Sequence, residues 1–412
     1  MEIDGGFFSD RARHEIKLRL LNRLFRACIL FATVAMWPAA TATVLAQTNV
    51  EQRIDARKFP SVFLAWSPAD NLKNEDPLVA GARHDLAIVS METLGLRWNN
   101  HFRGMADGFE PSAIAAAREI RAKLLKLNPN AILIAAVQYR DAAENYLPDE
   151  SPWWKRKDGG RVAGWEEGHY YLLDFSNPEF RAQVVKQARA MMATGVFDGI
   201  FLDWWKDDDD RLALVRALRS SVNEKALILA NVNDLRQPLT APFINGYYME
   251  CYRSATPKDW RRIANTLRWA EKNLRQPRVN CVETWFHKSR QDLNLMRATT
   301  TLALTMSDGY CLFGDPDSLP TPDHLHDWYD FWDKRLGRPL APGSRRTDGS
   351  WERDFECGTA VYNPMGNGVT VVRFKSPRRR LSNGETALQF DVSDCDGDIF
   401  LLPPADTSRS GP

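Results

Sequence analysis

The 412-residue chain lacks the short motifs that identify several large enzyme classes. It contains no G-x-S-x-G nucleophile elbow, no Walker A loop, no G-x-G-x-x-G turn and no H-E-x-x-H pair. These motifs are typical of serine hydrolases, nucleotide-dependent enzymes and gluzincin-like metalloproteases. Their absence argues against these classes and against a nucleotide ligand, and we expect the protein to use no cofactor.

The sequence is also poor in net charge and in cysteine clusters. Lysine and arginine number 54 against 53 acidic residues, so no basic field is present to recruit nucleic acid. None of the six cysteines forms a C-x-x-C motif or a Cys/His cluster, which disfavours structural zinc, and we expect no metal. Cys357 and Cys395 are candidates for a disulfide, whereas Cys251, Cys281 and Cys311 lie in apolar runs and are expected to be buried thiols.

The N-terminal segment has the three parts of a secretory signal. Basic residues between Arg11 and Arg26 precede the apolar run Ala27–Met36, and a small-residue stretch ends at Ala46. The pattern predicts a signal peptide over residues 1–46, cleaved after Ala46, so that the protein is secreted or periplasmic. An uncleaved N-terminal anchor is the alternative and would be its only contact with a membrane. Residues 47–60 are expected to be a linker.

From residue 61 onward, short β-rich runs alternate with helical stretches. The expected strands are Ser61–Trp66, Leu86–Met91, Ala131–Val137, Phe197–Trp204, Ala226–Asn231, Tyr247–Tyr252, Arg278–Trp285 and Gly309–Phe313. The expected helices are Pro111–Leu127, Pro178–Thr194, Asp209–Ser220, Pro257–Leu274 and Ser289–Thr305. Strands that alternate with crossovers predict a (β/α)8 TIM barrel over residues 61–337, with an open doubly wound sheet as the alternative.

Two segments depart from the barrel pattern. The connection from Gln138 to Asn177 is long and rich in aromatic residues, and it is either a lid at the barrel rim or a packed surface insertion. After residue 337, short alternating runs are separated by turn signals such as Asn363-Pro364. They predict a small C-terminal antiparallel β-module over residues 338–404, followed by a disordered tail over residues 405–412.

Three acidic residues lie where barrel strands are expected to end. Asp203 closes the apolar run Phe197–Leu202, Glu250 ends the sixth expected strand, and Glu283 lies in the seventh. The C-terminal ends of barrel strands converge on one mouth, so these carboxyl groups are expected to gather there. Glycoside cleavage requires two such groups, since one protonates the departing oxygen and the other attacks or stabilises the anomeric carbon.

Some of these positions also have plainer interpretations. Asp203 could cap the following helix, and Glu250 could pair with Arg253. His324 and His326 lie two residues apart on an expected helix, so they cannot share a face and a metal pair is not predicted.

Aromatic, amide and further acidic side chains are expected to line the same mouth. Aromatic rings offer flat faces to the C–H side of a pyranose, while amides and carboxylates hold its hydroxyl groups. The chain has 14 tryptophans, so such faces are abundant. The expected substrate-binding residues are Trp66, Glu92, Tyr139, Trp204, Trp205, Asn231, Asn233, Trp285 and Asp315.

The run Phe197–Asp203 resembles the fourth-strand signature of several (β/α)8 glycoside hydrolase families, among them the hypothetical glycoside hydrolase family 15 group and the endo-α-1,4-polygalactosaminidase group. The segment Trp351–Pro364 is similar to the opening of the β-module that closes such barrels. The resemblance implies that Asp203 is the fourth-strand catalytic carboxylate and Glu250 its sixth-strand partner, as in α-galactosidase-like barrels. The chain departs from that pattern by carrying Glu rather than Asp on the sixth strand, and Glu283 offers a rival partner.

These observations predict an exported glycosidase that acts on a polysaccharide or oligosaccharide. Asp203 is expected to be the nucleophile or electrostatic stabiliser and Glu250 the general acid/base, with Glu283 as a substitute or a hydroxyl ligand. The alternative is a non-catalytic carbohydrate-binding barrel that serves envelope or exopolysaccharide assembly, because a rim rich in tryptophan suits binding as well as cleavage.

Overall fold

The computed structural model describes residues 49–166, 168–314 and 324–403. In this part of the chain one sheet contains eight parallel strands in the order β1-β2-β3-β8-β9-β10-β11-β12. Their bounds are β1 Phe63–Ala65, β2 Leu86–Val89, β3 Ile132–Val137, β8 Gly199–Leu202, β9 Leu227–Asn231, β10 Gly246–Cys251, β11 Cys281–Trp285 and β12 Tyr310–Gly314. Each expected barrel strand is therefore present, within a few residues of its predicted ends.

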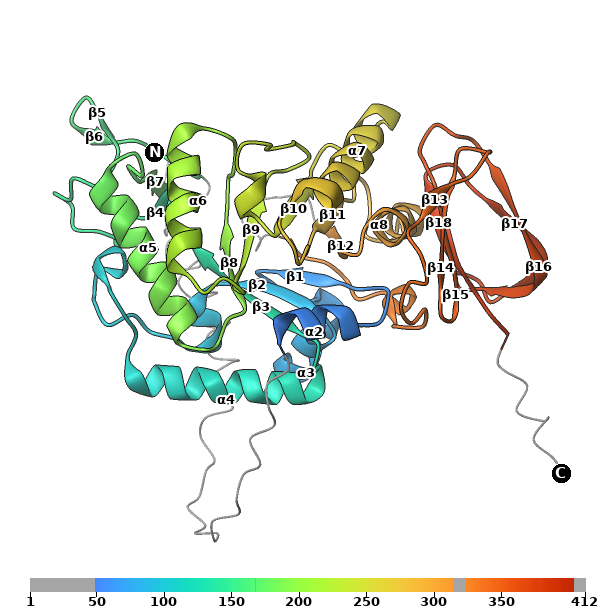
Figure 1. The fold of residues 1–412 in the computed structure, drawn as a ribbon, viewed down its shortest axis with the longest axis horizontal. Helices are drawn as coiled ribbons and strands as arrows, with labels where there is room; N and C mark the ends of the chain where they lie inside the picture. Colours follow the sequence, from blue (N-terminus) through green and yellow to red (C-terminus); the bar gives the residue numbers. More distant parts are fainter. Residues whose placement is uncertain (1–48, 167, 315–323, 404–412) are drawn as a thin grey trace, which may run out of the picture. The chain divides into compact units, whose positions relative to one another are not determined.

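The sheet closes on itself beside its first and last strands. Val62 forms a parallel bridge with Cys311, and the Cys311 N–H donates to the Ser61 carbonyl at 3.0 Å. The helices outside the strands are α3 Pro77–Ala82, α4 Pro111–Leu127, α5 Pro178–Ala193, α6 Asp209–Ser221, α7 Pro257–Asn273 and α8 Leu293–Met306 (Figure 1). The predicted (β/α)8 barrel is confirmed.

Local sequence explains where these helices begin. Proline occupies the first turn of α4, α5 and α7, where no intrahelical N–H bond is lost. Asp208 caps α6 by accepting the N–H of Arg211, and Thr256 forms a capping box with Asp259 at the start of α7.

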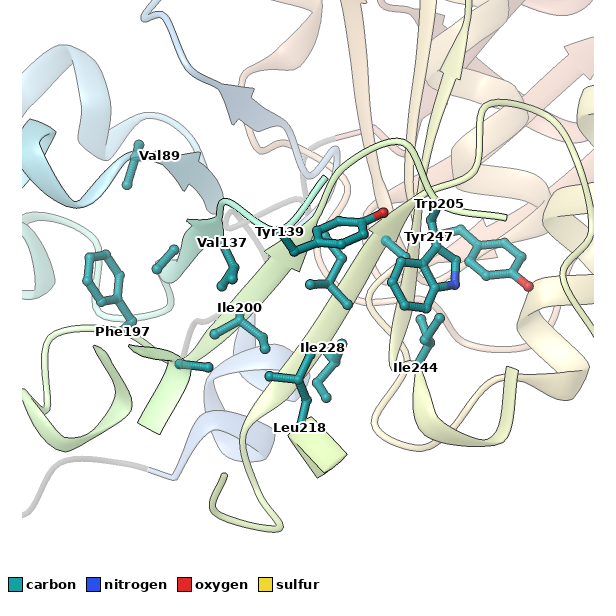
Figure 2. Close-up of a cluster of buried hydrophobic side chains, with 14 of the residues drawn as sticks. Val89, Val137, Tyr139, Phe197, Ile200, Trp205, Leu218, Ile228, Ile244 and Tyr247 are labelled. Carbon is teal, nitrogen blue, oxygen red and sulfur yellow. The ribbon is translucent and has the colours of Figure 1, made fainter. Parts of the chain in front are cut away.

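Alternate residues of each barrel strand face two separate apolar layers. On β8, Phe201 lies in the barrel interior with Tyr248, while Ile200 and Leu202 face the surrounding helices. Figure 2 shows part of the outer layer, in which Ile200 and Ile228 lie among residues that include Tyr139 and Trp205. This alternation places Asp203, the residue after β8, above the interior face and therefore at the mouth.

The opposite end of the barrel is held by a buried ion cluster. Residues 50–56, in the segment expected to be a linker, form the helix α2 (Val50–Ala56). Its Arg53 pairs with Asp198, which also accepts from Arg121 of α4 at 2.8 Å. Nearby, Phe59 and Gly337 form an antiparallel bridge, so the start and the end of the barrel chain are hydrogen-bonded to each other.

The long connection after β3 packs on the outer apolar layer, and its residues Arg140 and Asp141 reach the wall of the mouth. It contains the antiparallel pairs β4 (Asp141–Ala143) with β7 (Tyr170–Leu172) and β5 (Arg156–Lys157) with β6 (Gly160–Arg161). Trp154 is buried in the outer apolar layer, and the ring of Trp153 lies 5.5 Å from that of Phe180.

The C-terminal segment forms a second, antiparallel sheet. Its order is β13-β14-β15-β18-β16-β17, with bounds β13 Ser344–Arg345, β14 Trp351–Phe355, β15 Gly358–Asn363, β16 Thr370–Arg380, β17 Thr386–Val392 and β18 Asp396–Leu401. Helix α8 packs against β14, β15 and β18 (Figure 1). Arg297 of α8 pairs with Asp396 at 2.8 Å, and Arg353 of β14 pairs with Asp308 at 2.6 Å.

The candidate disulfide between Cys357 and Cys395 is not formed, because the two thiols lie at opposite ends of one strand pair. Cys357 precedes Gly358, which pairs with Leu401, whereas Cys395 precedes Asp396, which pairs with Asn363. A strand of six residues spans about 20 Å, far beyond the roughly 6 Å between Cα atoms that a disulfide bridges. Cys251, Cys281 and Cys311 are buried free thiols, as expected.

Two further findings concern the described residues only. No helix among residues 49–166, 168–314 and 324–403 is long and apolar enough to cross a bilayer. No group of three or more His, Cys, Asp or Glu side chains in these ranges is arranged to hold a metal ion.

Candidate active site

The C-terminal ends of the barrel strands bring together side chains that are far apart in the sequence. Asp203 follows β8, Asn231 ends β9, and Glu250 and Glu283 lie on β10 and β11. The strand register sets Tyr248 beside Asn231 and Glu250 beside Glu283. The three predicted acids therefore meet at one mouth.

One amide group contacts both principal acids. The Nδ2 of Asn231 donates to Asp203 Oδ1 at 2.9 Å and to Glu250 Oε2 at 2.7 Å. Its Oδ1 accepts the main-chain N–H of Asn233 at 3.1 Å, which turns the nitrogen toward the carboxyl groups. Because the two N–H bonds of an amide diverge by about 120°, the two oxygens lie about 5 Å apart.

Asp203 is held in a partly buried and strongly hydrogen-bonded position. Its Oδ1 also accepts the N–H of Trp204 at 2.9 Å, and its carbonyl accepts the hydroxyl of Tyr139 at 2.6 Å. Burial raises the pKa of the Asp203 carboxyl above its ordinary value, while the bonds from Asn231 and Trp204 oppose this rise. Both donors act on Oδ1 and favour the ionised form.

The surroundings of Glu250 raise its affinity for a proton. Burial raises the pKa of Glu250 to about 7, and the negative charges of Glu283 and Asp203 add to this rise, while His324 opposes it. A carboxyl group with a pKa near 7 carries a proton for part of the time at neutral pH, which is the state that a general acid needs.

The carboxylate of Glu283 is hydrogen-bonded to neighbouring side chains inside the barrel. Its side chain is fully buried, Tyr248 donates its hydroxyl to Oε2, and His324 Nδ1 lies 2.9 Å from the same oxygen. Gly314 on β12 faces this carboxylate, and a Cβ at that position would overlap Oε1. Glu283 is therefore enclosed by Tyr248, His324 and Gly314, whereas Asp203 and Glu250 are both partly exposed.

His324 and Tyr248 are site residues that the sequence did not reveal. His324 was expected on a helix with His326, but the segment is not helical and His324 has a φ of +57°. The turn directs its ring to Glu283 and Tyr248, whereas the Nε2 of His326 lies 2.9 Å from that of His84. The only signal in the sequence was a histidine soon after the eighth strand.

The exposed wall of the mouth combines an indole with a cation. Trp204 is 51% exposed, has a φ of +50°, and is covered by the guanidinium of Arg140 at 4.3 Å. Arg140 donates to Asp141 at 2.6 Å, and the Asp141 carboxylate also accepts the N–H of Trp165. Burial raises the pKa of Asp141, and the negative charge of Asp203 adds to the rise.

Two predicted aromatic site residues belong to the packing below the mouth instead. Trp205 is buried, its indole N–H donates to Thr240 at 3.0 Å, and its ring lies 5.7 Å from that of Tyr139 (Figure 2). Tyr139 is itself buried and reaches the site only through its hydroxyl. The left-handed backbone at Trp204 turns Trp205 inward, so the structure does not place Trp205 on the substrate side.

The other predicted substrate-binding residues that the structure describes contact neighbours other than Asp203 and Glu250. Trp66 follows β1 and packs on Phe201 at 5.8 Å, and Trp285 ends β11 with its ring 5.8 Å from that of Tyr252. Glu92 forms an ion pair with Arg103 at 2.8 Å. Asn233 contributes through its backbone, as described above, and Asp315 lies outside the described residues.

Comparison with known proteins identifies the architecture but not a family. No family model matches the sequence, and no curated protein matches it. Among solved structures, the maltogenic α-amylase AmyB of Thermotoga neapolitana is 12% identical, with a TM-score of 0.52 over 84% of this chain and 100% of that chain.

Two further solved structures are similar. An α-amylase of Geobacillus thermoleovorans, solved with acarbose, is 11% identical with a TM-score of 0.49 over 84% of this chain and 98% of that chain. A variant of the glycoside hydrolase domain of PelA from Pseudomonas aeruginosa is 14% identical with a TM-score of 0.41, over 65% and 99%. At such identities the likeness to AmyB shows the barrel fold alone.

Proposed function

We propose that the protein is a glycoside hydrolase that cleaves a polysaccharide or oligosaccharide with Asp203 and Glu250. The observation that carries the proposal is that the side-chain amide of Asn231 donates to both Asp203 and Glu250, and that each of these two acids is partly exposed. The fold shared with AmyB agrees with the proposal, although a barrel by itself supports many reactions.

The different surroundings of the two acids support different roles. Glu250, with its pKa raised to about 7, protonates the departing glycosidic oxygen, while ionised Asp203 attacks the anomeric carbon. The leaving sugar departs with the proton. Glu250 then removes a proton from water, whose oxygen displaces Asp203 and restores both groups.

The spacing of the acids supports retention of anomeric configuration. Retaining enzymes have carboxyl groups about 5–5.5 Å apart and inverting enzymes about 6.5–9.5 Å. Bonds of 2.9 and 2.7 Å from one nitrogen leave the two oxygens at most about 6 Å apart, which is too close for the water of an inverting reaction.

Glu283 fits a positioning role better than that of the second catalytic acid. Its carboxylate is already bonded by Tyr248 and His324, and it is fully buried. A substrate oxygen would have to displace both partners to reach it, whereas Glu250 is partly exposed.

The test is release of reducing ends from a panel of polysaccharides and oligosaccharides. Asp203→Asn and Glu250→Gln should each lower the turnover of a natural substrate by at least about 100-fold without loss of folding. Asp210→Asn and Glu224→Gln, which change exposed acids outside the mouth, should leave it unchanged. Full activity in either mouth variant contradicts the proposal, and binding without cleavage supports a carbohydrate-binding barrel instead.

A further inference from the structure

Helix α7 lines two neighbouring hollows that are separate from the acids of the mouth. A hollow of about 480 Å³ lies between the start of α7 and the loop after β9, and a second of about 310 Å³ lies between α7 and the C-terminal sheet. Arg261 and Asn265 line both hollows, so the two are adjacent, and we call them together the α7 groove. None of its described lining residues hydrogen-bonds to Asp203 or Glu250.

The α7 groove is strongly cationic in a chain whose total charge is balanced. The cations that line it are Arg236, Lys258, Arg261, Arg262, Arg268 and Arg345. The single lining carboxylate, Asp234, is bonded by Arg262 at 2.7 Å. Within the described ranges no carboxylate lies within salt-bridge distance of the other five cations, so the groove presents uncompensated positive charge.

The spacing of these cations suits a chain of repeating anionic units. Arg261, Asn265 and Arg268 lie on one face of α7, at intervals of one helical turn. Arg261 and Arg268 are two turns apart, which is about 11 Å and close to the length of two sugar residues. Arg345 on β13 faces the same hollow from the sheet.

The groove also contains groups that recognise sugar rather than charge alone. The indole of Trp351 is partly exposed and lies under the guanidinium of Arg268 at 4.7 Å. The hydroxyl of Tyr362 is buried in the wall and has no hydrogen-bond partner among the described residues. That hydroxyl is shielded from solvent, so the partly exposed indole of Trp351 is the group that can pack against a sugar ring.

We propose that the α7 groove binds an acidic polysaccharide whose sugar residues carry carboxylate groups. Guanidinium groups bind carboxylates through two parallel hydrogen bonds, which gives both charge and orientation. Trp351 packs on a sugar ring. The site is independent of the proposed hydrolysis and does not require it.

The test is titration calorimetry of the full chain carrying Asp203→Asn, with a galacturonate hexamer as the probe. This background removes hydrolysis from the measurement, so failure of the proposed activity cannot mimic failure of the groove. The hexamer should bind, and its methyl ester, which has the same backbone without charge, should bind at least about tenfold more weakly.

Groove and control variants then locate the site. Arg261→Gln with Arg345→Gln should weaken binding at least about tenfold, whereas the charge-matched pair Arg189→Gln with Lys123→Gln, exposed on α5 and α4, should change it less than about twofold. A DNA oligomer of equal charge should bind at least about tenfold more weakly than the hexamer.

Four results would overturn the proposal. They are no binding of the hexamer, equal binding of its methyl ester, no effect of the groove pair, and DNA binding as tight as that of the hexamer. The last would make the groove a general polyanion site.

Discussion

Asp203 and Glu250 share one hydrogen-bond donor and yet have different proton affinities. Asn231 and the N–H of Trp204 both stabilise the anion of Asp203, whereas Glu250 receives only one of these bonds and lies nearer the charge of Glu283. Burial acts on both, so the difference arises from the donors and the neighbouring charges. Under the proposed mechanism, this difference lets Glu250 act as the acid and Asp203 as the nucleophile of one reaction.

The first prediction concerns the pH dependence of turnover. The general acid must be protonated, so kcat/KM should fall about tenfold per pH unit above the Glu250 pKa of about 7. The nucleophile must be ionised, so activity should also fall at low pH, below the raised pKa of Asp203. We call the fall in kcat/KM above the pKa of Glu250 the alkaline limb. When the substrate is an aryl glycoside, whose leaving group needs no proton, the Glu250→Gln variant should show no alkaline limb. An unchanged alkaline limb in this variant would exclude Glu250 as the acid.

The second prediction separates the effects of Glu283 and His324 on the pKa of Glu250. The charge of Glu283 raises the pKa of Glu250 and His324 lowers it. Glu283→Gln should therefore move the alkaline limb to lower pH, and His324→Asn should move it to higher pH. Shifts in the same direction would contradict this assignment, and a purely structural role for either residue would lower activity without moving the limb.

Most elements of the barrel could be predicted from the sequence. All eight barrel strands and five helices were predicted within a few residues, because buried parallel strands read as apolar runs and proline marks helix starts. The mouth was predictable from the same pattern, since an acid ending an apolar strand is costly without a partner. His324 and the inward turn of Trp205 were not predictable, because both depend on left-handed backbone at non-glycine residues.

The third prediction concerns the ion cluster that joins α2 and α4 to β8. Asp198 accepts from Arg53 and Arg121, and these charges hold its pKa below the ordinary value despite burial. Asp198→Asn leaves two buried guanidinium groups without their anion and should lower the free energy of unfolding by about 3–5 kcal/mol at pH 7.

The sign of the pH effect gives a further check on Asp198. A carboxyl group with a depressed folded pKa stabilises the protein above its unfolded pKa, and this stabilisation is lost as the pH falls through the folded value. The difference between wild type and Asp198→Asn in urea unfolding should therefore shrink below about pH 4. Glu110→Gln, which breaks the exposed pair with Arg97, should cost less than about 1 kcal/mol. An equal effect of both variants would contradict the role of burial.

Barrel and C-terminal sheet share helix α8, so they should unfold together. Arg353 reaches from β14 to the carbonyls of Leu304 and Ser307 at the end of α8, and Arg297 of α8 reaches to Asp396 of the sheet. Arg353→Gln orphans buried carbonyl groups and should lower stability by about 3 kcal/mol. Calorimetry should show one transition in both proteins, and two transitions in the wild type would show that the units are uncoupled.

The bridge between Phe59 and Gly337 has a consequence for engineering the chain. The barrel segment begins and ends at neighbouring points on the side remote from Asp203 and Glu250. Joining residues 59 and 337 by a short peptide, with new termini in a surface loop, would give a circular permutant of the barrel strands that lacks α2 and the C-terminal sheet. Because both are bonded to the barrel by buried ion pairs, this permutant should be less stable than the full chain. A fusion partner attached ahead of α2 would lie at this same end of the barrel, away from the mouth.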